Sequence, residues 1–401
     1  MTQNTTPTTD QLSASQVSEL ETAQSFYQIV YSQFKENKAA LFGAFVILLF
    51  VLIAVGAPVI EWALGVDANT QNVFNRYKSP LSRIQASQDV RESALQQFIS
   101  KNPEAAKKIE IQLLEKKLVS PLRPEDALYD WANLESAKAI SAIEQIDSPL
   151  KKDLIKTVKN FSSFHIFGTD ELGRDVFMRL VYGTQVSMGV GVLVAIVSAL
   201  IGLIIGSLAG YYGGLVDTVL MRTTDALLSL PLLPVLVVIA AIDLQKVPFL
   251  NAITKYGNES IIKLVFILCL FSWMVVARLV RGSILSLRER EFILASKTLG
   301  ATDSTIIIRH MFPNVIAPLL VSVTLGVGES ILFEAALSFL GLGIQPPTPS
   351  WGNMLFNALE LIYKAPFLAI IPGLLILLVV VSFNFLGDGL QDAIDPKSVK
   401  R

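Results

Sequence analysis

The chain has 401 residues, of which 52% are hydrophobic, and a formal net charge of −1. A mean hydropathy of +0.53 exceeds that of ordinary soluble domains, so many apolar side chains must face lipid. The near-zero net charge argues against nucleic-acid binding.

Residue types that carry catalysis or bind metals are scarce. The one cysteine, Cys269, lies inside an apolar run, which excludes a disulfide framework and a cysteine metal site. The two histidines, His165 and His310, are far apart in the sequence, so no metal site is expected. We find no Walker A loop, nucleophile elbow or HExxH motif. The sequence therefore predicts no catalytic residues, and any ATP must be hydrolysed by another chain.

The N-terminal region leads to a first membrane span. Residues 1 to about 22 are rich in Thr, Ser and Gln, a composition typical of disorder. Residues 23–38 fit either an amphipathic surface helix or a plain lead-in to the span. Residues 39–60 carry no charge and are long enough to cross a bilayer. Lys35 and Lys38 precede this run, so within residues 1–38 the sequence predicts a cytoplasmic N-terminal tail. The run starts too late and is too long for a cleaved signal peptide.

Residues 61–165 differ from the rest in being charged and without an apolar run long enough to span. Asp89–Leu118 and Ala132–Thr157 fit amphipathic helices, and prolines between them interrupt the pattern. Long loops escape the positive-inside rule, so their lysines are compatible with an external location. We predict an inserted extracytoplasmic helical domain.

The next segment, FGTDELGRDVFMRLVYG, occupies residues 167–183. Thr169 or Asp170 is suited to capping a short helix, because short polar side chains accept from free backbone N–H groups. That helix would lie along the outer membrane interface. Its shared apolar face would contain Val176, Phe177, Leu180 and Val181.

The second and third spans are predicted at Val186–Ala209 and Val219–Ile242. Small residues every fourth position let helix backbones approach closely, and here they predict helix packing. These residues are Gly202, Gly206 and Gly210. In the third span, Arg222 and Asp225 are three residues apart, which favours a salt bridge near the cytoplasmic end.

Three more spans are expected after an outer loop at 243–260. They are Ile261–Val280, Val315–Ile344 and approximately 366–386. We expect Arg278 and Arg281 to extend toward the cytoplasmic surface. Trp351 is predicted at interface depth, followed by a short outer helix over Asn353–Lys364. The remaining residues, 388–401, would form a cytoplasmic tail.

The fold class predicted from this pattern is all-α. It comprises six transmembrane helices with both termini in the cytoplasm. Five of the helices lie within a core over residues 166–387, and the helical insert precedes that core.

Between the fourth and fifth spans lies a polar, mostly basic stretch, Leu287–Asn314, which we call the elbow. Apolar residues at Phe292, Ile293, Ala295 and Leu299 lie close to one helical face and predict an exposed docking strip. Gly300 is expected to end the first helix, and Asp303 or Ser304 to cap a second one. Pro313 would end that helix or begin the next.

Several strings resemble a known family. Ala295-Ser296, Gly300 and Phe312-Pro313 resemble the "EAA" loop of bacterial ABC-importer permeases, in which this loop is the coupling helix that contacts the ATPase. Residues 168–176 resemble the signature "GTDxxGRDV" of the peptide and nickel branch. ALSFLGLGIQPPTPSWG and FNFLGDGLQDAIDP resemble the second membrane subunit of oligopeptide and dipeptide importers. The resemblance covers the first span weakly and then residues 161–396, and it does not include the inserted residues 61–160.

The resemblance implies a type I ABC-importer permease fold and an inner membrane location. It also implies a heterodimer with a homologous permease, two ABC ATPases and an extracytoplasmic substrate-binding protein. ATP and Mg would be bound by the ATPases, so the chain itself would need no cofactor. Peptides are the first expectation for the cargo, although the branch includes carriers of nickel and of sugar conjugates.

The same resemblance assigns an ATPase-coupling role within the elbow. The family's glutamate falls on Leu294 here, and Glu291, one turn earlier, is positioned to take over part of its role. The implied coupling residues are Glu291, Phe292, Leu294, Ala295, Ser296, Leu299, Gly300 and Pro313.

Glu329 and Glu334 are ionisable groups inside a predicted span. Five residues apart on a helix, they point about 140° away from each other, so both cannot face one narrow pathway. We favour Glu329 as the path-facing group and Glu334 as a structural partner near the outer gate. In an alternative, both are packed and protonated. The two acids also support a second function, an ion-coupled secondary transporter, although no inverted repeat is evident. An intramembrane enzyme has no supporting residues.

Overall fold

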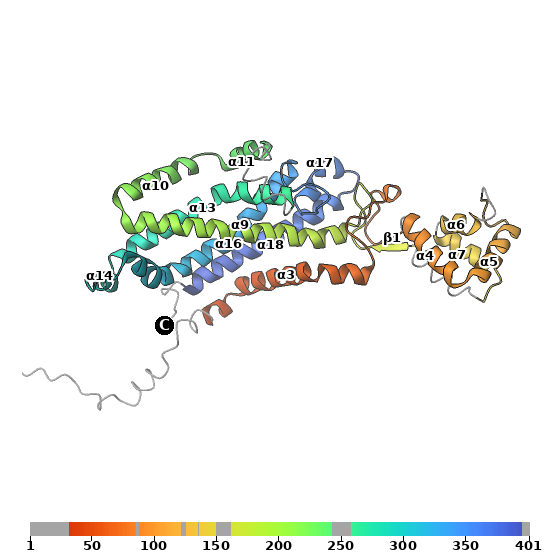
Figure 1. The fold of residues 1–401 in the computed structure, drawn as a ribbon, viewed down its shortest axis with the longest axis horizontal. Helices are drawn as coiled ribbons and strands as arrows, with labels where there is room; N and C mark the ends of the chain where they lie inside the picture. The colour runs from red at the N-terminus through yellow and green to blue at the C-terminus, as the bar shows by residue number, and fades with distance from the viewer. Residues whose placement is uncertain are drawn as a thin grey trace, which may run out of the picture.

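The computed structural model describes residues 32–85, 88–121, 126–134, 136–149, 162–242 and 258–394. Within these residues, five helices are long and apolar enough to cross a membrane. They lie side by side along the long axis of the molecule (Figure 1). Each covers one of the apolar runs predicted to span. These helices are α3 (Lys38–Leu64), α9 (Val176–Tyr212), α13 (Glu259–Arg288), α16 (Phe312–Phe339) and α18 (Phe367–Ile394).

The predicted third span is a broken helix. It consists of α10 (Gly214–Leu228) and α11 (Leu232–Ala241), which are bent by 85° relative to each other. Pro231 lies at the break, where its missing N–H and its ring prevent the α10 hydrogen-bonding pattern from continuing. The predicted single helix over Val219–Ile242 is therefore wrong in its continuity.

The bent pair nevertheless completes a crossing. The ends of α9 and α13 meet, because the Arg288 guanidinium donates to the carbonyl of Tyr211 at 3.4 Å. Because α13 ends near the elbow, it begins at the other end of the bundle, and the chain must cross to that end before α13. Ala241 at the end of α11 and Asn258 at the start of α13 line the same cavity there. Counting α10 and α11 as one crossing gives six spans, as predicted.

The first and last spans end at the same side. The Asn37 amide donates to Asp392 of α18 at 3.3 Å, so α3 begins where α18 ends. The described parts of both chain ends lie near the elbow, and β1 lies at the opposite end of the bundle (Figure 1). Helix α18 continues to Ile394, so residues 388–394 of the predicted tail are helical.

The GTDELGRDV segment forms a loop up to Asp175, and the short helix predicted there begins at Val176 and is continuous with the second span as α9. Asp175, and not Thr169 or Asp170, caps α9: its carboxylate accepts from the N–H of Met178 at 2.6 Å. Gly173 has a φ of +73°, and a Cβ there would lie 1.8 Å from the carbonyl oxygen of Asn72. This close approach lets residues 72–81 pair with the loop, because Leu172 and Asp170 accept backbone N–H groups from that segment.

The insert projects from a two-stranded sheet, the one departure from the predicted all-α class in the described chain. Strands β1 (Ser82–Gln85) and β2 (Ser162–His165) are antiparallel, with Gln85 opposite Ser162. We call residues 86–161, between the strands, the insert. Because residues 66–81 pack against the start of α9 and the GTDELGRDV loop, this separate body covers fewer residues than the predicted 61–165.

The described insert consists of four helices with a core of their own. These helices are α4 (Gln88–Lys101), α5 (Pro103–Glu115), α6 (Ala127–Ala132) and α7 (Ser136–Glu144). Leu113, Leu128 and Trp131 are buried among them. Pro103, in the first turn of α5, breaks the continuous helix predicted over Asp89–Leu118. Figure 1 shows this body beyond β1 and away from the membrane helices.

The turn after α16 also differs from the prediction. The α16 helix ends at Phe339, before the predicted Ile344, and Gly341 takes a φ of +76°. Trp351 is fully buried inside the protein, with its indole N–H donating to the Leu180 carbonyl at 3.2 Å, so its side chain does not face the membrane surface. In place of one helix over Asn353–Lys364 there are two short ones. They are η6 (Asn353–Leu355) and α17 (Ala358–Leu361).

Two predictions for loops and termini fall largely outside the described residues. They are the disordered stretch 1–22 and the outer loop, of which 243–257 is not described. Of the surface helix predicted at 23–38, residues 32–36 are described and helical.

Candidate functional site

The elbow is a short helix followed by a glycine-dependent turn. The helix α14 (Glu291–Thr298) ends in a Schellman arrangement, in which the Ala301 N–H donates to Ser296 at 3.1 Å. Gly300 has a φ of +82°, which only glycine adopts without strain. The next cap is Thr302, whose hydroxyl accepts from Thr305, so the predicted caps Asp303 and Ser304 are wrong.

Two further segments complete the elbow. They are α15 (Asp303–Thr305) and the π-helix η5 (Ile306–Met311). Pro313 lies in the first turn of α16, where a missing N–H costs nothing.

Helix α14 carries apolar side chains that nothing in the described chain covers. Phe292, Leu294 and Leu299 are 45%, 52% and 87% exposed. Ile293 instead points into the bundle and is 2% exposed, so the predicted strip is wrong to include it. The other implied coupling residues, Glu291, Ala295, Gly300 and Pro313, are exposed, and Ser296 is half-buried. An exposed apolar helix rimmed by charges is a typical protein-docking surface.

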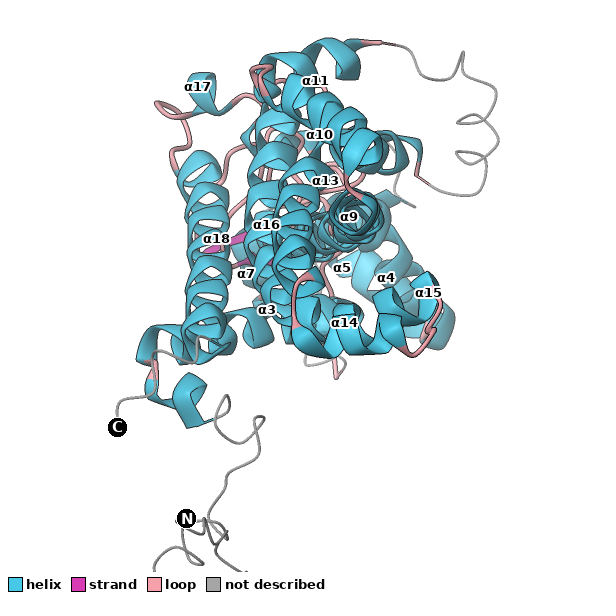
Figure 2. Ribbon diagram, turned by 90° about the vertical axis from the view of Figure 1, so that its left-hand side faces the viewer, coloured by secondary structure: helices cyan, strands magenta, loops and turns pink. Residues whose placement is uncertain are grey.

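The elbow is hydrogen-bonded to the end of α9. The Tyr211 hydroxyl donates to Asp303 at 2.6 Å, and the two tyrosines that end α9 line a cavity of about 480 Å³ beside α14. Figure 2 shows α14 and α15 in front of the bundle, at the end that faces the viewer. Movement of α14 would therefore be transmitted to α9 as well as to α13 and α16.

The three glycines of α9 contact α13. A Cβ at Gly202 would lie 2.6 Å from the Val276 Cβ, and one at Gly206 would lie 2.5 Å from the Ala277 carbonyl oxygen. At Gly210 the nearest atom would be the Ile284 Cβ, at 2.8 Å. The two helix backbones thus approach as closely as small residues allow.

Ion pairs join α10 to α13, and sequence reasoning missed them. The predicted partner of Asp225 was Arg222, but the structure pairs Asp225 with Arg278. Arg281 and Asp217 form a bidentate pair, with Nη2 2.6 Å from Oδ2. Asp217 and Asp225 are eight residues apart, hence on one helical face, which was the available signal. The arginines are therefore paired within the chain, which the sequence analysis did not foresee.

Glu334 and Glu329 lie in different surroundings on α16. Glu334 is fully buried and accepts from the hydroxyls of Ser187 and Ser338, both at 2.9 Å. Those serines accept in turn from the backbone N–H groups of Trp351 and Ile344. Glu329 is exposed on the surface of this chain and has no hydrogen bond or ion pair in its described part.

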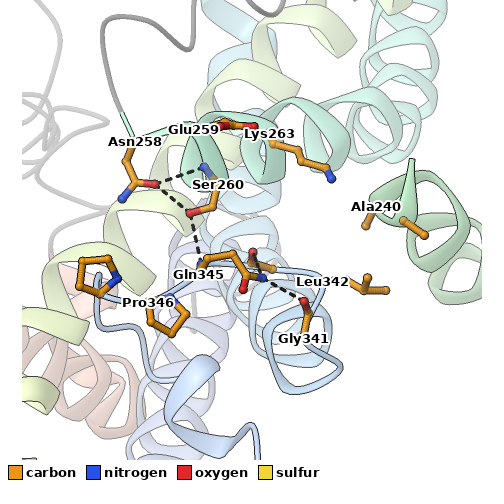
Figure 3. Close-up of a pocket in the computed structure, with 12 residues that line it drawn as sticks. Ala240, Asn258, Glu259, Ser260, Lys263, Gly341, Leu342, Gln345 and Pro346 are labelled. Atoms are coloured by element: carbon orange, nitrogen blue, oxygen red, sulfur yellow. Dashed lines mark hydrogen bonds between the residues drawn. The ribbon is translucent and has the colours of Figure 1, made fainter. Parts of the chain in front are cut away.

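A second cavity, of similar volume, opens at the opposite end of α13 from the elbow (Figure 3). It has a volume of about 490 Å³ and lies between the end of α11, the start of α13 and the turn after α16. Ser260 ties its wall together, since it donates to Asn258 at 2.8 Å and accepts from the N–H of Gln345. Lys263 points across the cavity toward Ala240. The volume suits a small solute, and the lining contains one basic and one acidic residue, Lys263 and Glu259.

No described group of three or more His, Cys, Asp or Glu side chains is arranged to hold a metal ion.

Comparisons with known proteins match most of the bundle. Residues 202–400 match the family described as "Binding-protein-dependent transport system inner membrane component". Residues 25–80 match the "N-terminal TM domain of oligopeptide transport permease C". Neither matched range includes the insert.

Two curated relatives share similar identity with this chain. The dipeptide transport system permease protein DppC of Alkalihalophilus pseudofirmus is 41% identical over 236 residues, covering 59% of this chain and 73% of that protein. The glutathione transport system permease protein GsiD of Escherichia coli is 42% identical over 233 residues, covering 58% and 72%. A solved structure of the MetNI methionine ABC transporter in inward-facing conformations has a TM-score of 0.43 at 19% identity, covering 54% of this chain and 96% of that chain.

Proposed function

The chain belongs to the inner membrane permeases of ABC importers, in the oligopeptide and dipeptide family, and we propose that its cargo is a small peptide. It is a multi-pass permease subunit of an ATP-driven importer, a class that works with ATPase and binding-protein partners. Peptide cargo is supported by the relatives named for dipeptide and glutathione transport.

The proposed assembly contains one copy of this chain and one homologous permease, two ATPases and an external binding protein. ATP and Mg²⁺ would be held by the ATPases, and this chain would supply half of the pathway without itself catalysing hydrolysis. The uncovered apolar side chains of α14 carry this proposal, because a helix fixed to three spans can pass ATPase movement into the bundle.

The proposed orientation follows from the two ends of the bundle. With the elbow in the cytoplasm against the ATPases, both described chain ends are cytoplasmic and the insert is outside (Figure 1). Protease added to intact spheroplasts should then cut within residues 88–149. Cleavage only after the cytoplasmic face is opened would reverse this orientation.

An ion-coupled carrier built on Glu329 and Glu334 finds no support. Both curated relatives are permeases of transport systems in the ABC-importer family, and Glu334 is enclosed by hydrogen bonds.

Uptake into proteoliposomes tests the function directly. The complete transporter, with its binding protein outside and ATP inside, should accumulate labelled dipeptide or glutathione. Accumulation should stop when ATP is replaced by a non-hydrolysable analogue, and a proton gradient should not substitute for ATP. Accumulation of nickel without peptide would refute the cargo assignment.

A further inference from the structure

A buried cluster of charges lies where the GTDELGRDV loop meets α9. Asp170 accepts from the Nε of Arg174 at 2.7 Å, and its Oδ2 lies 3.4 Å from the Nε of Arg179. The other carboxylate oxygen of Asp170 accepts from two backbone N–H groups, those of Leu172 and Arg174. The guanidinium groups of Arg174 and Arg179 therefore share one carboxylate, which also accepts two backbone hydrogen bonds.

Arg179 is left with an unsatisfied group. Its side chain is 3% exposed, and its Nη1 is buried without a hydrogen-bond partner in the described part of the chain. Leaving a buried guanidinium partly unpaired is costly, so such a group calls for a partner. Glu171 lines the same pocket as Arg179, but it forms no ion pair with Arg179 among the described residues.

Arg179 lines a small pocket whose far wall comes from the segment around α17. The pocket has a volume of about 40 Å³, and Asn353, Asn357 and Leu361 form part of its wall. The Asn353 amide is already bonded to the carbonyls of Ile344 and Thr348. On this measure a cavity of about 10–15 Å³ holds one water, so the pocket has room for a carboxylate head but not for a whole peptide.

We propose that this pocket receives one carboxylate side chain of the extracytoplasmic binding protein when that protein docks. A guanidinium is the group best suited to a carboxylate, through charge-assisted and bidentate hydrogen bonds. The pocket lies at the end of the bundle opposite the elbow, and Asn357 at its wall is exposed, so a docking protein can reach it. The inference rests on the proposed function, because that function places this end outside.

Affinity of the binding protein for the complete transporter in nanodiscs tests the proposal. Arg179→Gln should weaken binding about tenfold or more, as expected for loss of a charge-assisted contact. Asn357→Trp should weaken it similarly by filling the pocket from an exposed position, with Asp170, Arg174 and Arg179 intact. Arg76→Gln is the matched control, because Arg76 is an exposed cation in the segment packed against the GTDELGRDV loop. The binding protein should have the same affinity for this variant as for the wild-type transporter.

The remaining outcomes overturn either this proposal or the proposed function. Unchanged affinity in both variants would mean that water alone fills the pocket. If the Arg179→Gln transporter does not assemble, normal affinity of the binding protein for the Asn357→Trp transporter is enough to refute the proposal. The binding protein should be tested empty, loaded with a peptide, and loaded with the same peptide amidated at its C-terminus. A loss seen only with the free-acid peptide would assign the pocket to the cargo. Failed peptide uptake by the wild type with normal docking would refute the proposed function and leave this inference standing.

Discussion

At the residue scale, Glu334 joins three parts of the bundle through two serine hydroxyls. Each hydroxyl donates its one proton to the carboxyl group and accepts a backbone N–H, so the carboxyl group links α9, α16 and the turn after α16. Replacing Glu334 by Ala removes the acceptor for both serine protons and leaves a cavity. We expect a loss of about 2 kcal/mol or more in the free energy of unfolding.

Glu334→Gln should cost less, because an amide still offers one acceptor. Glu329→Gln is the control, since Glu329 is exposed on the same helix, and it should change uptake while leaving stability intact. Thermal unfolding of the purified complex and peptide uptake separate the two effects. Identical behaviour of the two Gln variants would refute the division of roles between the acids.

At the scale of elements, the contact of α9 with α13 depends on glycine. A Cβ at Gly206 would meet the Ala277 carbonyl at 2.5 Å, whereas a Cβ at Gly189, on the same helix, would meet nothing within 4 Å. Gly206→Ala should therefore destabilise the fold by about 1–3 kcal/mol through overpacking. Gly189→Ala should cause no loss, because alanine favours the helix. Equal melting temperatures for the two variants would contradict this account.

The elbow is the second element whose geometry makes a prediction. Gly300→Phe forces a bulky residue into the left-handed region, at about 1–2 kcal/mol, and should displace α14. ATPase association and transport should be lost while membrane insertion persists. Gly300→Asn is the matched control, since asparagine tolerates this conformation, and it should retain both. Co-purification of the ATPases measures the outcome, and normal association with Gly300→Phe would show that α14 does not dock them.

At the scale of the whole molecule, the insert and the bundle are separable bodies. The cores of the two contain no common residues, and Gln85 faces Ser162 where the insert begins and ends. Replacing residues 86–161 by Asn-Gly should close β1 and β2 with a two-residue hairpin turn. The shortened chain should insert and assemble with an unchanged melting temperature, and residues 82–165 alone should be soluble and show helical circular dichroism. Aggregation of both products would show that the two bodies stabilise each other.

Local pattern was sufficient to locate five of the spans and the turn in the elbow. An uncharged run of about 20 residues has no favourable alternative to a membrane helix, because unpaired backbone groups are costly in lipid. Gly300 predicted the turn, because a residue in the left-handed backbone conformation is nearly always glycine. The break at Pro231 and the start of α5 at Pro103 also follow from the ring of proline, although the 85° bend does not.

Partners distant in sequence were decided only by the tertiary structure. Arg278 pairs with Asp225 and Glu334 with Ser187, and nothing in the local sequence selects these partners among several polar groups in the spans. The same holds for Trp351, which the sequence assigned to the interface and the packing buried, and for the Asp170, Arg174 and Arg179 cluster. The sequence by itself determined where helices form, because that depends on solvent and neighbouring residues. Which faces meet depends on how the side chains of several helices fill space together, and only the folded bundle decides it.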